Sequence, residues 1–273
     1  MSTRRLERPA IVSRSEWIAA RQGLLAKEKA FTRAYDALNR DRRALPWVKV
    51  DKPYVFDGPS RRETLADLFA GRSQLIVNHF MFGPGWMEGC VGCSFGADHL
   101  TGALVHLAQR DVSYVAVSRA PLAEIEAFKR RMGWSFKWVS SFGSDFNYDF
   151  HVSFTPEDAA AGTVYYNYAT QPYISDEASG VSVFYKDDGE IFHTYSTYAR
   201  GGELGLGTYV LLDMTPKGRD EHGPHHSLVD WVRHHDRYDA GGRVDASGRY
   251  HAAAETDACC HCADDATGQP ART

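Results

Sequence analysis

The sequence predicts an α/β protein, and two patterns support this class. An apolar run at residues 75–82 has the length of a buried strand. A helical pattern at 93–110, a second strand at 111–118 and a second helix at 122–132 follow it. This order is typical of a βαβα unit whose first two strands are parallel. Further on, two apolar runs at 180–185 and 190–195 flank Asp-Asp-Gly, which predicts an antiparallel hairpin.

The composition excludes several classes of protein. The chain has 273 residues, of which 43% are hydrophobic and 24% charged, as in ordinary globular proteins. Its formal net charge of −4 argues against a general nucleic-acid binder. No apolar run reaches the roughly 20 residues of a membrane span. The first residues lack the apolar core of a signal peptide, so we expect a cytoplasmic protein.

The first element is predicted to be a long amphipathic helix. Ser13 and Glu16 form a capping-box pattern, and the helix is expected to end near Arg43, before Pro46. Large apolar residues recur every seven positions, at Trp17, Leu24, Phe31 and Leu38. We expect the basic residues on the other faces to be solvated; binding of a partner is the alternative. Residues 1–44 are therefore predicted to be a helical extension.

Shorter elements complete the predicted domain, at residues 45–238. Strands are expected at 47–50 and 54–56, a short helix at 64–70, a strand at 163–168 and a helix at 203–214. An irregular stretch at 134–154 is dense in aromatic residues. After residue 238 the composition changes to Gly, Ala, Asp and Ser with few large apolar residues, which predicts a disordered tail at 239–273.

The sharpest chemical feature is the Cys-x-x-Cys pair formed by Cys90 and Cys93. It lies between a predicted strand and the helix that follows, where helix N-terminal N–H groups favour a thiolate. Cys90 would be the exposed nucleophile, and Cys93 would resolve a mixed disulfide one turn later. Gly89 and Gly92 would leave room for the backbone of a partner. Glu88 opposes thiolate formation, and two inert buried cysteines are the structural alternative.

The same thiols suggest a metal site as the alternative. Two thiolates one turn apart are good ligands for soft metals, and His79 and His193 lie on strands that could neighbour them. Cys90, Cys93 and these histidines would suit Cu(I) or Zn. The main interpretation requires no cofactor, and in it both histidines are core residues. The cluster of histidines at 222–235 lacks a recognised ligand pattern.

Several motifs make the chain resemble a bacterial family of thioredoxin-like proteins classified as a domain of unknown function. The resemblance covers residues 15–238, and its central motif reads Trp-x3-Cys-x-Gly-Cys-Ser-Phe at 86–95. Further matching stretches are 75–86, 118–122, 129–134, 146–150 and 195–200. The resemblance implies a thioredoxin-like fold with an N-terminal helical extension and an aromatic-rich insertion. Members are described as thiol-disulfide oxidoreductases. The resemblance supports the fold more firmly than it supports this reaction.

The sequence departs from better-known thioredoxin-like proteins at two points. The stretch that should face the cysteine pair, residues 178–182, lacks the proline with which thioredoxins hold substrate. Met87 stands where peroxiredoxins place Thr or Ser, although Pro84 precedes the motif. Both departures weaken the inference that this chain uses the thioredoxin or the peroxiredoxin mechanism. Peroxide reduction through another arrangement stays open.

Further candidate site residues lie in the aromatic stretch at 134–154 and in the tail. The aromatic stretch is either a loop pinned into the core or a wall over the cysteines. The three tail thiols either relay electrons, capture a soft metal or have no role. The predicted substrate pocket comprises Trp86, Trp134, Trp138, Phe146 and Arg200, and the tail thiols are Cys259, Cys260 and Cys262.

Together these patterns predict a thiol-disulfide oxidoreductase acting through Cys90 and Cys93. Its partners would be a protein or small-molecule disulfide and a reducing partner of unknown identity, with no role for nucleic acid or a membrane. The alternatives are a protein that holds copper or zinc for transfer or oxidation chemistry, and a non-catalytic binding module on the same fold.

Overall fold

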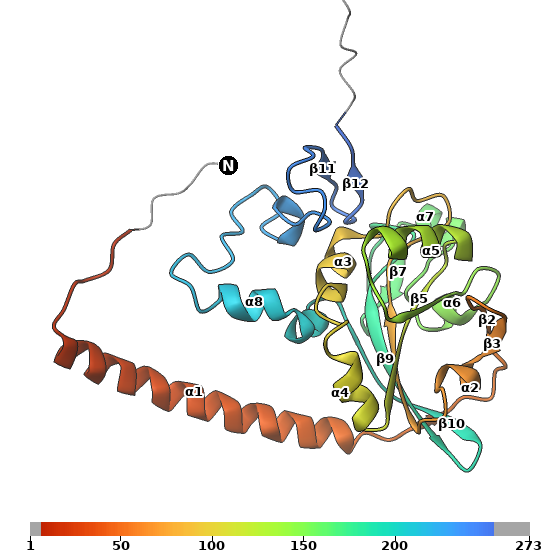
Figure 1. Cartoon of the computed structure of the whole chain (residues 1–273), viewed down its shortest axis with the longest axis horizontal. Helices are drawn as coiled ribbons and strands as arrows, with labels where there is room; N and C mark the ends of the chain where they lie inside the picture. The colour runs from red at the N-terminus through yellow and green to blue at the C-terminus, as the bar shows by residue number, and fades with distance from the viewer. Residues whose placement is uncertain (1–6, 254–273) are drawn as a thin grey trace, which may run out of the picture.

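A mixed eight-stranded sheet forms the centre of the computed structural model, which describes residues 7–253 (Figure 1). Its strand order is β1-β10-β9-β4-β5-β6-β2-β3. The strands are β1 (Val48–Lys49), β2 (Val55–Asp57), β3 (Arg62–Thr64), β4 (Gln74–His79), β5 (Val112–Ser118), β6 (Lys137–Ser140), β9 (Gly180–Asp187) and β10 (Glu190–Tyr198).

The order and direction of the central strands are those of a thioredoxin-like fold. β4, β5 and β6 run parallel, and β9 and β10 extend the sheet antiparallel on the other side of β4. Between β4 and β5 lie α3 (Val91–Ala97) and α4 (Leu104–Gln109), and α5 (Leu122–Arg131) connects β5 to β6. The predicted βαβα unit, its parallel strands and the hairpin are therefore confirmed.

Two hydrophobic clusters lie on the two faces of the sheet. Alternate residues of β4 point one way, so that Leu75 and Val77 join a cluster with Phe146 and Phe184. The other cluster contains Cys90 together with Phe80 and Phe82, which directly follow β4, and side chains of α5 and β6. The dithiol and the Phe146 side of the core are thus on opposite faces.

The predicted helix at 93–110 is two helices in the structure. α3 already begins at Val91, and a turn separates it from α4. Gly96 lies in the last turn of α3 and Gly102 lies between the two helices, and glycine lowers helix propensity. A side chain at Gly96 would lie 3.1 Å from Leu206, so glycine lets that segment pack closely on α3.

Smaller elements also differ from the predictions. The predicted strand at 163–168 is the first part of a separate hairpin, and the predicted helix at 203–214 is divided into a 3-10 helix and an α-helix. The remaining elements are α2 (Leu65–Leu68), α6 (Phe146–Asp149), α7 (Pro156–Ala161), β7 (Thr163–Tyr166), β8 (Ala169–Pro172), η1 (Ala199–Gly205), α8 (Gly207–Leu212), η2 (Leu228–Asp230), β11 (Arg243–Val244) and β12 (Tyr250–His251).

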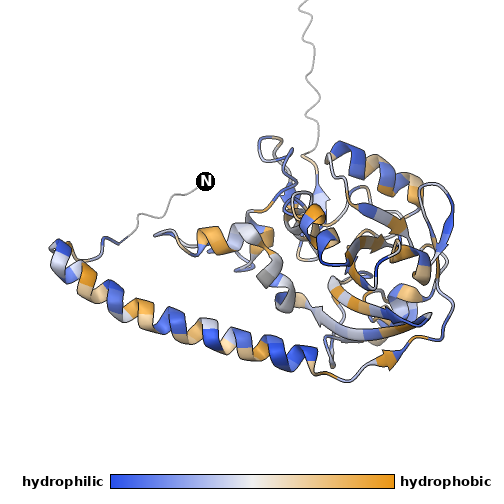
Figure 2. Ribbon diagram, turned by 60° about the horizontal axis from the view of Figure 1, so that its bottom comes forward, coloured by the Kyte–Doolittle hydropathy of each residue, from blue (hydrophilic) through white to orange (hydrophobic). Residues whose placement is uncertain are grey.

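The N-terminal helix, α1 (Arg14–Arg43), forms as predicted but projects away from the domain (Figure 1). Ser13 and Glu16 make both hydrogen bonds of the capping box. None of the 30 helix residues is buried. Figure 2 shows hydrophobic and hydrophilic residues alternating along the whole helix. Among the residues described, no helix is both long enough and apolar enough to cross a bilayer.

The folded part of the chain extends past residue 238 to the end of the described residues. β11 and β12 pair as a small hairpin over residues 243–251, and Val244 is 8% exposed. Val244 packs with Val91 and Phe95 of α3. The composition of this stretch predicted disorder because it is poor in large apolar residues, but here turn geometry and one valine dock it on the domain.

Candidate active site

Cys90 occupies the N-cap of α3, directly after the loop that leaves β4. Its backbone N–H donates to the carbonyl of Met81 at 2.9 Å, and the Met81 N–H approaches the Cys93 sulfur at 3.5 Å. Both cysteines are free thiols. Cys90 is 6% exposed and Cys93 is partly buried. The structure places both cysteines at the start of a helix, as predicted. The prediction that Cys90 is exposed is wrong, because the backbone at Gly248 packs against its sulfur and leaves Cys93 the less buried of the two thiols.

The two thiols differ in acidity. A hydrogen bond from Cys93 lowers the pKa of Cys90, helped by the backbone N–H groups of Cys93 and Gly92, while burial and Asp245 oppose this. The hydrogen bond to Cys90 and burial raise the pKa of Cys93 well above its usual value. Cys90 is therefore the more acidic of the two thiols, and Cys93 donates a hydrogen bond to it.

The turn between β11 and β12 covers Cys90. The Val91 N–H donates to the Gly248 carbonyl at 3.0 Å. A β-carbon at Gly248 would lie 2.7 Å from the Cys90 sulfur, and the φ of Gly248 is +86°, so both space and backbone require glycine here. Asp245 holds the turn by accepting from the Ser247 and Arg249 N–H groups, at 2.9 and 3.1 Å. We call residues 243–251 the cover hairpin.

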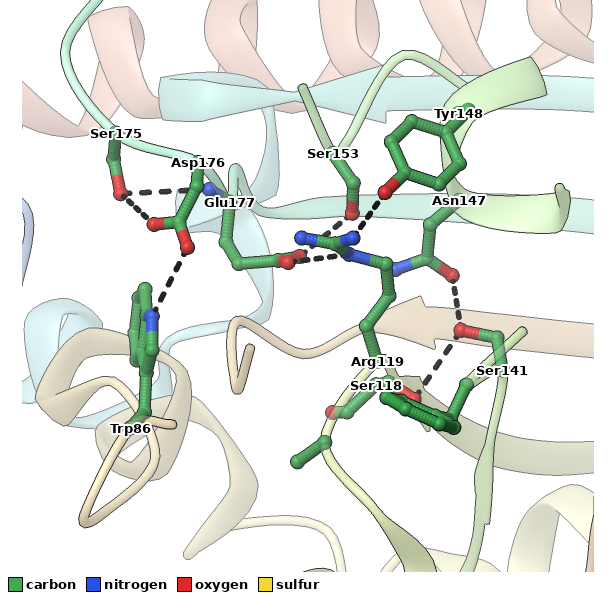
Figure 3. Close-up of polar contacts among 12 residues, drawn as sticks. Trp86, Ser118, Arg119, Ser141, Asn147, Tyr148, Ser153, Ser175, Asp176 and Glu177 are labelled. Carbon is green, nitrogen blue, oxygen red and sulfur yellow. Dashed lines mark hydrogen bonds and ion pairs between the residues drawn. The ribbon is translucent and has the colours of Figure 1, made fainter. Parts of the chain in front are cut away.

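Arg249 joins the cover hairpin to the loop before the cysteines. Its guanidinium lies 4.0 Å from the centre of the Trp86 ring and forms an ion pair with Asp176. Trp86 Nε1 donates to Asp176 at 3.4 Å, and Figure 3 shows this contact beside Glu177. Trp86 itself is 6% exposed and belongs to the same cluster as Cys90. Of the five predicted pocket residues, Trp86 is the one that contacts the cover hairpin, through Arg249.

A buried ion pair lies next to this contact, at the carboxyl ends of the central strands. Arg119, directly after β5, donates from Nε to Glu177 at 2.6 Å and also contacts the Tyr148 hydroxyl (Figure 3). Glu177 is 2% exposed and accepts from Ser153 at 2.7 Å. Burial raises the pKa of Glu177 to about 7, against the opposing effect of Arg119. Glu177 is therefore a proton-exchanging group at neutral pH.

Arg119 and Tyr148 also line a small cleft of about 330 Å³. Pro84, from the loop between β4 and the cysteines, forms another part of its wall. Cys90 and Cys93 do not line this cleft, so the dithiol and the cleft are separate features of the same edge of the sheet.

A second cluster of charged side chains surrounds Glu88, close to the cysteine pair, and offsets the negative charge of its carboxylate. His234 is fully buried; its Nε2 donates to the Gly89 carbonyl at 2.8 Å, and its Nδ1 lies 2.9 Å from Glu88. Burial opposes ionisation of Glu88, yet His234 and Arg131 lower its pKa to about 2. The negative charge that the sequence sets against a Cys90 thiolate is thus largely compensated.

The predicted aromatic pocket does not form. Trp134 and Trp138 are buried in the cluster around Phe80, where they donate to Asp98 and Ser118. Phe146 is fully buried on the other face of the sheet, with His79. The side chain of Arg200 is 85% exposed and pairs with Glu203. Most of the aromatic stretch is pinned into the core, on both faces of the sheet. Phe142 is an exception, because it is 55% exposed and lines the cleft beside Tyr148.

The structure does not bring His79 and His193 to the thiols. His79 stacks on Phe146 and Phe150, and a chain of short contacts through Ser182 and Ser196 connects it to His193. Burial lowers the pKa of both imidazoles, that of His79 to about 3, so burial favours the neutral form of each ring. Within residues 7–253 no three His, Cys, Asp or Glu side chains are arranged to hold a metal. The metal set predicted from sequence is therefore not assembled.

The remaining predictions concern glycines and the tail. The space beside Gly89 is filled by the Phe80 and Phe128 rings, and that beside Gly92 by Leu228, so these glycines serve internal packing. Cys259, Cys260 and Cys262 lie outside the described residues.

Sequence reasoning missed four groups around the dithiol, and their local signals are weak. The missed residues are Glu177, His234, Gly248 and Arg249. Each follows or lies in an irregular segment and reaches the site only through tertiary packing. The run Asp-x-Ser-Gly at 245–248 is a recognisable turn signal, but nothing in it indicates a contact with Cys90.

Comparison with solved structures finds thioredoxin-fold peroxiredoxins at low similarity. Peroxidoxin BcpB from Mycobacterium tuberculosis is 14% identical, with a TM-score of 0.42 over 60% of this chain and 95% of that one. Peroxiredoxin Q from Xanthomonas campestris is 12% identical, with a TM-score of 0.42 over 63% of this chain and 99% of that one. No curated protein matches the chain.

A family comparison covers most of the sequence. The match is to a bacterial protein family of unknown function, DUF899, over residues 6–238. It includes α1, the central sheet and the cysteine pair, and it ends before the cover hairpin. The chain therefore belongs to DUF899.

Proposed function

We propose that this protein is a thiol-disulfide oxidoreductase whose reacting group is the Cys90–Cys93 pair. The observation that carries the proposal is the pair of free thiols at the start of α3, with Cys90 at the N-cap and Cys93 one turn later. A hydrogen bond from Cys93 to Cys90 supports it, because this contact lowers the pKa of Cys90 and raises the pKa of Cys93. The thioredoxin-like sheet and the α3 N-terminus are consistent with this chemistry, and the substrate is proposed only as a disulfide.

The reaction has two exchanges. The Cys90 thiolate attacks one sulfur of the substrate disulfide, a mixed disulfide forms, and the other substrate sulfur leaves as a thiolate that takes up a proton. Cys93 then loses its proton and attacks the Cys90 sulfur, which forms the Cys90–Cys93 disulfide and releases the second substrate thiol. Two electrons pass from the dithiol to the substrate. An external dithiol returns the protein to the reduced state.

The reaction requires the cover hairpin to move away from Cys90. Gly248 lies against the Cys90 sulfur, so a disulfide can line up with that sulfur only when residues 245–249 move aside. We therefore expect small disulfides to react faster than large folded ones, because a small molecule needs a smaller displacement of the hairpin.

The test is to trap the mixed disulfide. Reduced Cys93→Ser protein is treated with bis(2-hydroxyethyl) disulfide in a background where Cys259, Cys260 and Cys262 are serine, and intact mass is measured. We expect one adduct on Cys90 in Cys93→Ser, none in Cys90→Ser, and loss of two hydrogens without an adduct in the protein with both cysteines. Failure of Cys90 to form an adduct in folded Cys93→Ser would falsify the proposal.

A further inference from the structure

α1 carries an apolar stripe that no described element covers. The stripe consists of six large side chains along one side of the helix. Their exposed fractions are 47% for Trp17, 42% for Ile18, 51% for Leu24, 39% for Leu25, 66% for Phe31 and 51% for Leu38. Soluble proteins seldom leave so many large apolar side chains together in water, and such rows usually mark an interaction surface.

The junction after α1 directs the helix away from its own domain. Thirty residues give a length of about 45 Å. The Arg42 guanidinium lies over the Tyr195 ring, 4.9 Å from its centre. Trp47 then packs on Tyr185 and Phe192, and β1 pairs with β10. Because these contacts fix the chain directly after the helix, α1 extends away from the sheet that it precedes (Figures 1 and 2).

The helix and the rest of the chain have opposite charge. α1 contains eight basic and four acidic side chains, a formal charge of +4, whereas the whole chain carries −4. The residues outside α1 therefore carry −8. A partner that covers α1 must supply apolar contact together with negative charge, and a second copy of this chain has that charge.

The end of this chain does not have the composition to cover the stripe. Residues 254–273 include four acidic residues but no Leu, Ile, Val, Phe, Trp, Tyr or Met. Such a segment offers charge without the apolar surface that six large side chains need.

We propose that α1 is a dimerisation element, and that in the dimer the α1 stripe of each copy lies on the acidic domain of the other. One helix exchanged in each direction gives a closed two-fold assembly with two equal interfaces. The seven-residue spacing of Trp17, Leu24, Phe31 and Leu38 keeps the stripe in line along the helix, as a long contact requires.

The test measures the mass of the full chain by sedimentation velocity over a range of concentrations. We expect twice the 30.5 kDa chain mass for the unaltered protein. Leu24→Glu places a charge in the stripe, and Ala26→Glu places the same charge on the opposite face of α1, where residue 26 is exposed. Leu24→Glu should weaken the dimer at least ~10-fold while Ala26→Glu leaves it unchanged. Circular dichroism checks that both variants keep the helix.

Salt and lipid distinguish this arrangement from others. Opposite charges across the interface mean that raising NaCl from about 0.05 to about 0.5 M weakens the dimer. A dimer that salt strengthens would instead pair two basic α1 helices, and would overturn the proposal. So would a concentration-independent monomer, or a monomer that binds vesicles containing phosphatidylglycerol through Leu24, since the stripe would then be a membrane surface.

Discussion

Cys93 controls the protonation of Cys90 by donating its own hydrogen. Among the contacts that lower the pKa of Cys90, this hydrogen bond is the largest, ahead of the backbone N–H groups of α3. Removing the hydrogen-bond donor at position 93 should therefore raise the pKa of Cys90 more than replacing the sulfur there with oxygen. A serine at position 93 keeps a donor, whereas an alanine removes it.

We predict that Cys93→Ala raises the pKa of Cys90 and that Cys93→Ser raises it less. The measurement is the rate of Cys90 alkylation by iodoacetamide as a function of pH, read by peptide mass spectrometry. At neutral pH Cys93→Ala should react several-fold more slowly than Cys93→Ser. Equal pH profiles for the two variants would assign the acidity of Cys90 to the helix backbone alone.

Glu177 gives folding a pH dependence in the acidic to neutral range. Its folded pKa of about 7 lies above its ordinary value of 4.5, so between these values the folded state binds more protons than the unfolded state. The stability that this group contributes is full below pH 4.5 and is lost as pH rises through 7. The shift corresponds to at most about 3 kcal/mol.

We predict that Glu177→Gln removes this component. The free energy of unfolding in urea is compared at about pH 5 and about pH 7.5, on either side of the folded pKa. The proteins compared are the unaltered chain, Glu177→Gln and, as a control, Glu157→Gln on the exposed side of α7. Stability should fall less between the two pH values in Glu177→Gln than in the other two proteins. A slope in Glu177→Gln equal to the control would show that the carboxyl ionises normally.

At the scale of elements, the cover hairpin is held by few contacts. Arg249 connects it to Trp86 and Asp176, and the Gly248 carbonyl accepts from α3. Its strands have two residues each, so local pairing contributes little and the arginine contact contributes much.

We predict that Arg249→Ala uncovers Cys90. Alkylation of reduced Cys90 at fixed pH should become several-fold faster, because the hairpin spends more time displaced. Arg243→Ala, an exposed arginine on the same hairpin, serves as the control and should react like the unaltered protein. If Arg249→Ala reacts no faster than Arg243→Ala, the hairpin does not limit access.

The elements that the sequence predicts well are those with local signals. The capping box and seven-residue spacing predict α1, and the apolar run, Cys-x-x-Cys and following helix predict the β4–α3 unit. The sequence does not predict the cover hairpin, because its docking depends on tertiary contacts of one valine, one glycine and one arginine. These contacts exist only when the hairpin lies beside α3. The predicted metal site does not form, because the alternation of side chains along β4 places His79 on the face of the sheet opposite the thiols.

At the scale of the whole molecule, the end of the folded domain is testable by truncation. A chain that stops at residue 253 keeps every contact described here. A chain that stops at residue 238 loses Val244 from its cluster, the hydrogen bond from Val91 to Gly248 and the Arg249–Asp176 ion pair.

We predict that stopping at residue 253 leaves the free energy of unfolding unchanged, and that stopping at residue 238 lowers it by about 2 kcal/mol. Urea unfolding followed by tryptophan fluorescence measures both. Equal stability of the two truncated chains would mean that residues 239–253 rest on the domain without stabilising it.

The distance along the chain between the dithiol and its cover has a consequence for biosynthesis. Cys90 leaves the ribosome 158 positions before Gly248. The central sheet and α3 can assemble from residues that are translated earlier, so the nascent protein presents an uncovered Cys90 until residues 243–251 have been translated and have docked. A truncated messenger RNA, or a ribosome that stalls before residue 243, therefore yields a folded protein that lacks the cover hairpin and leaves Cys90 accessible.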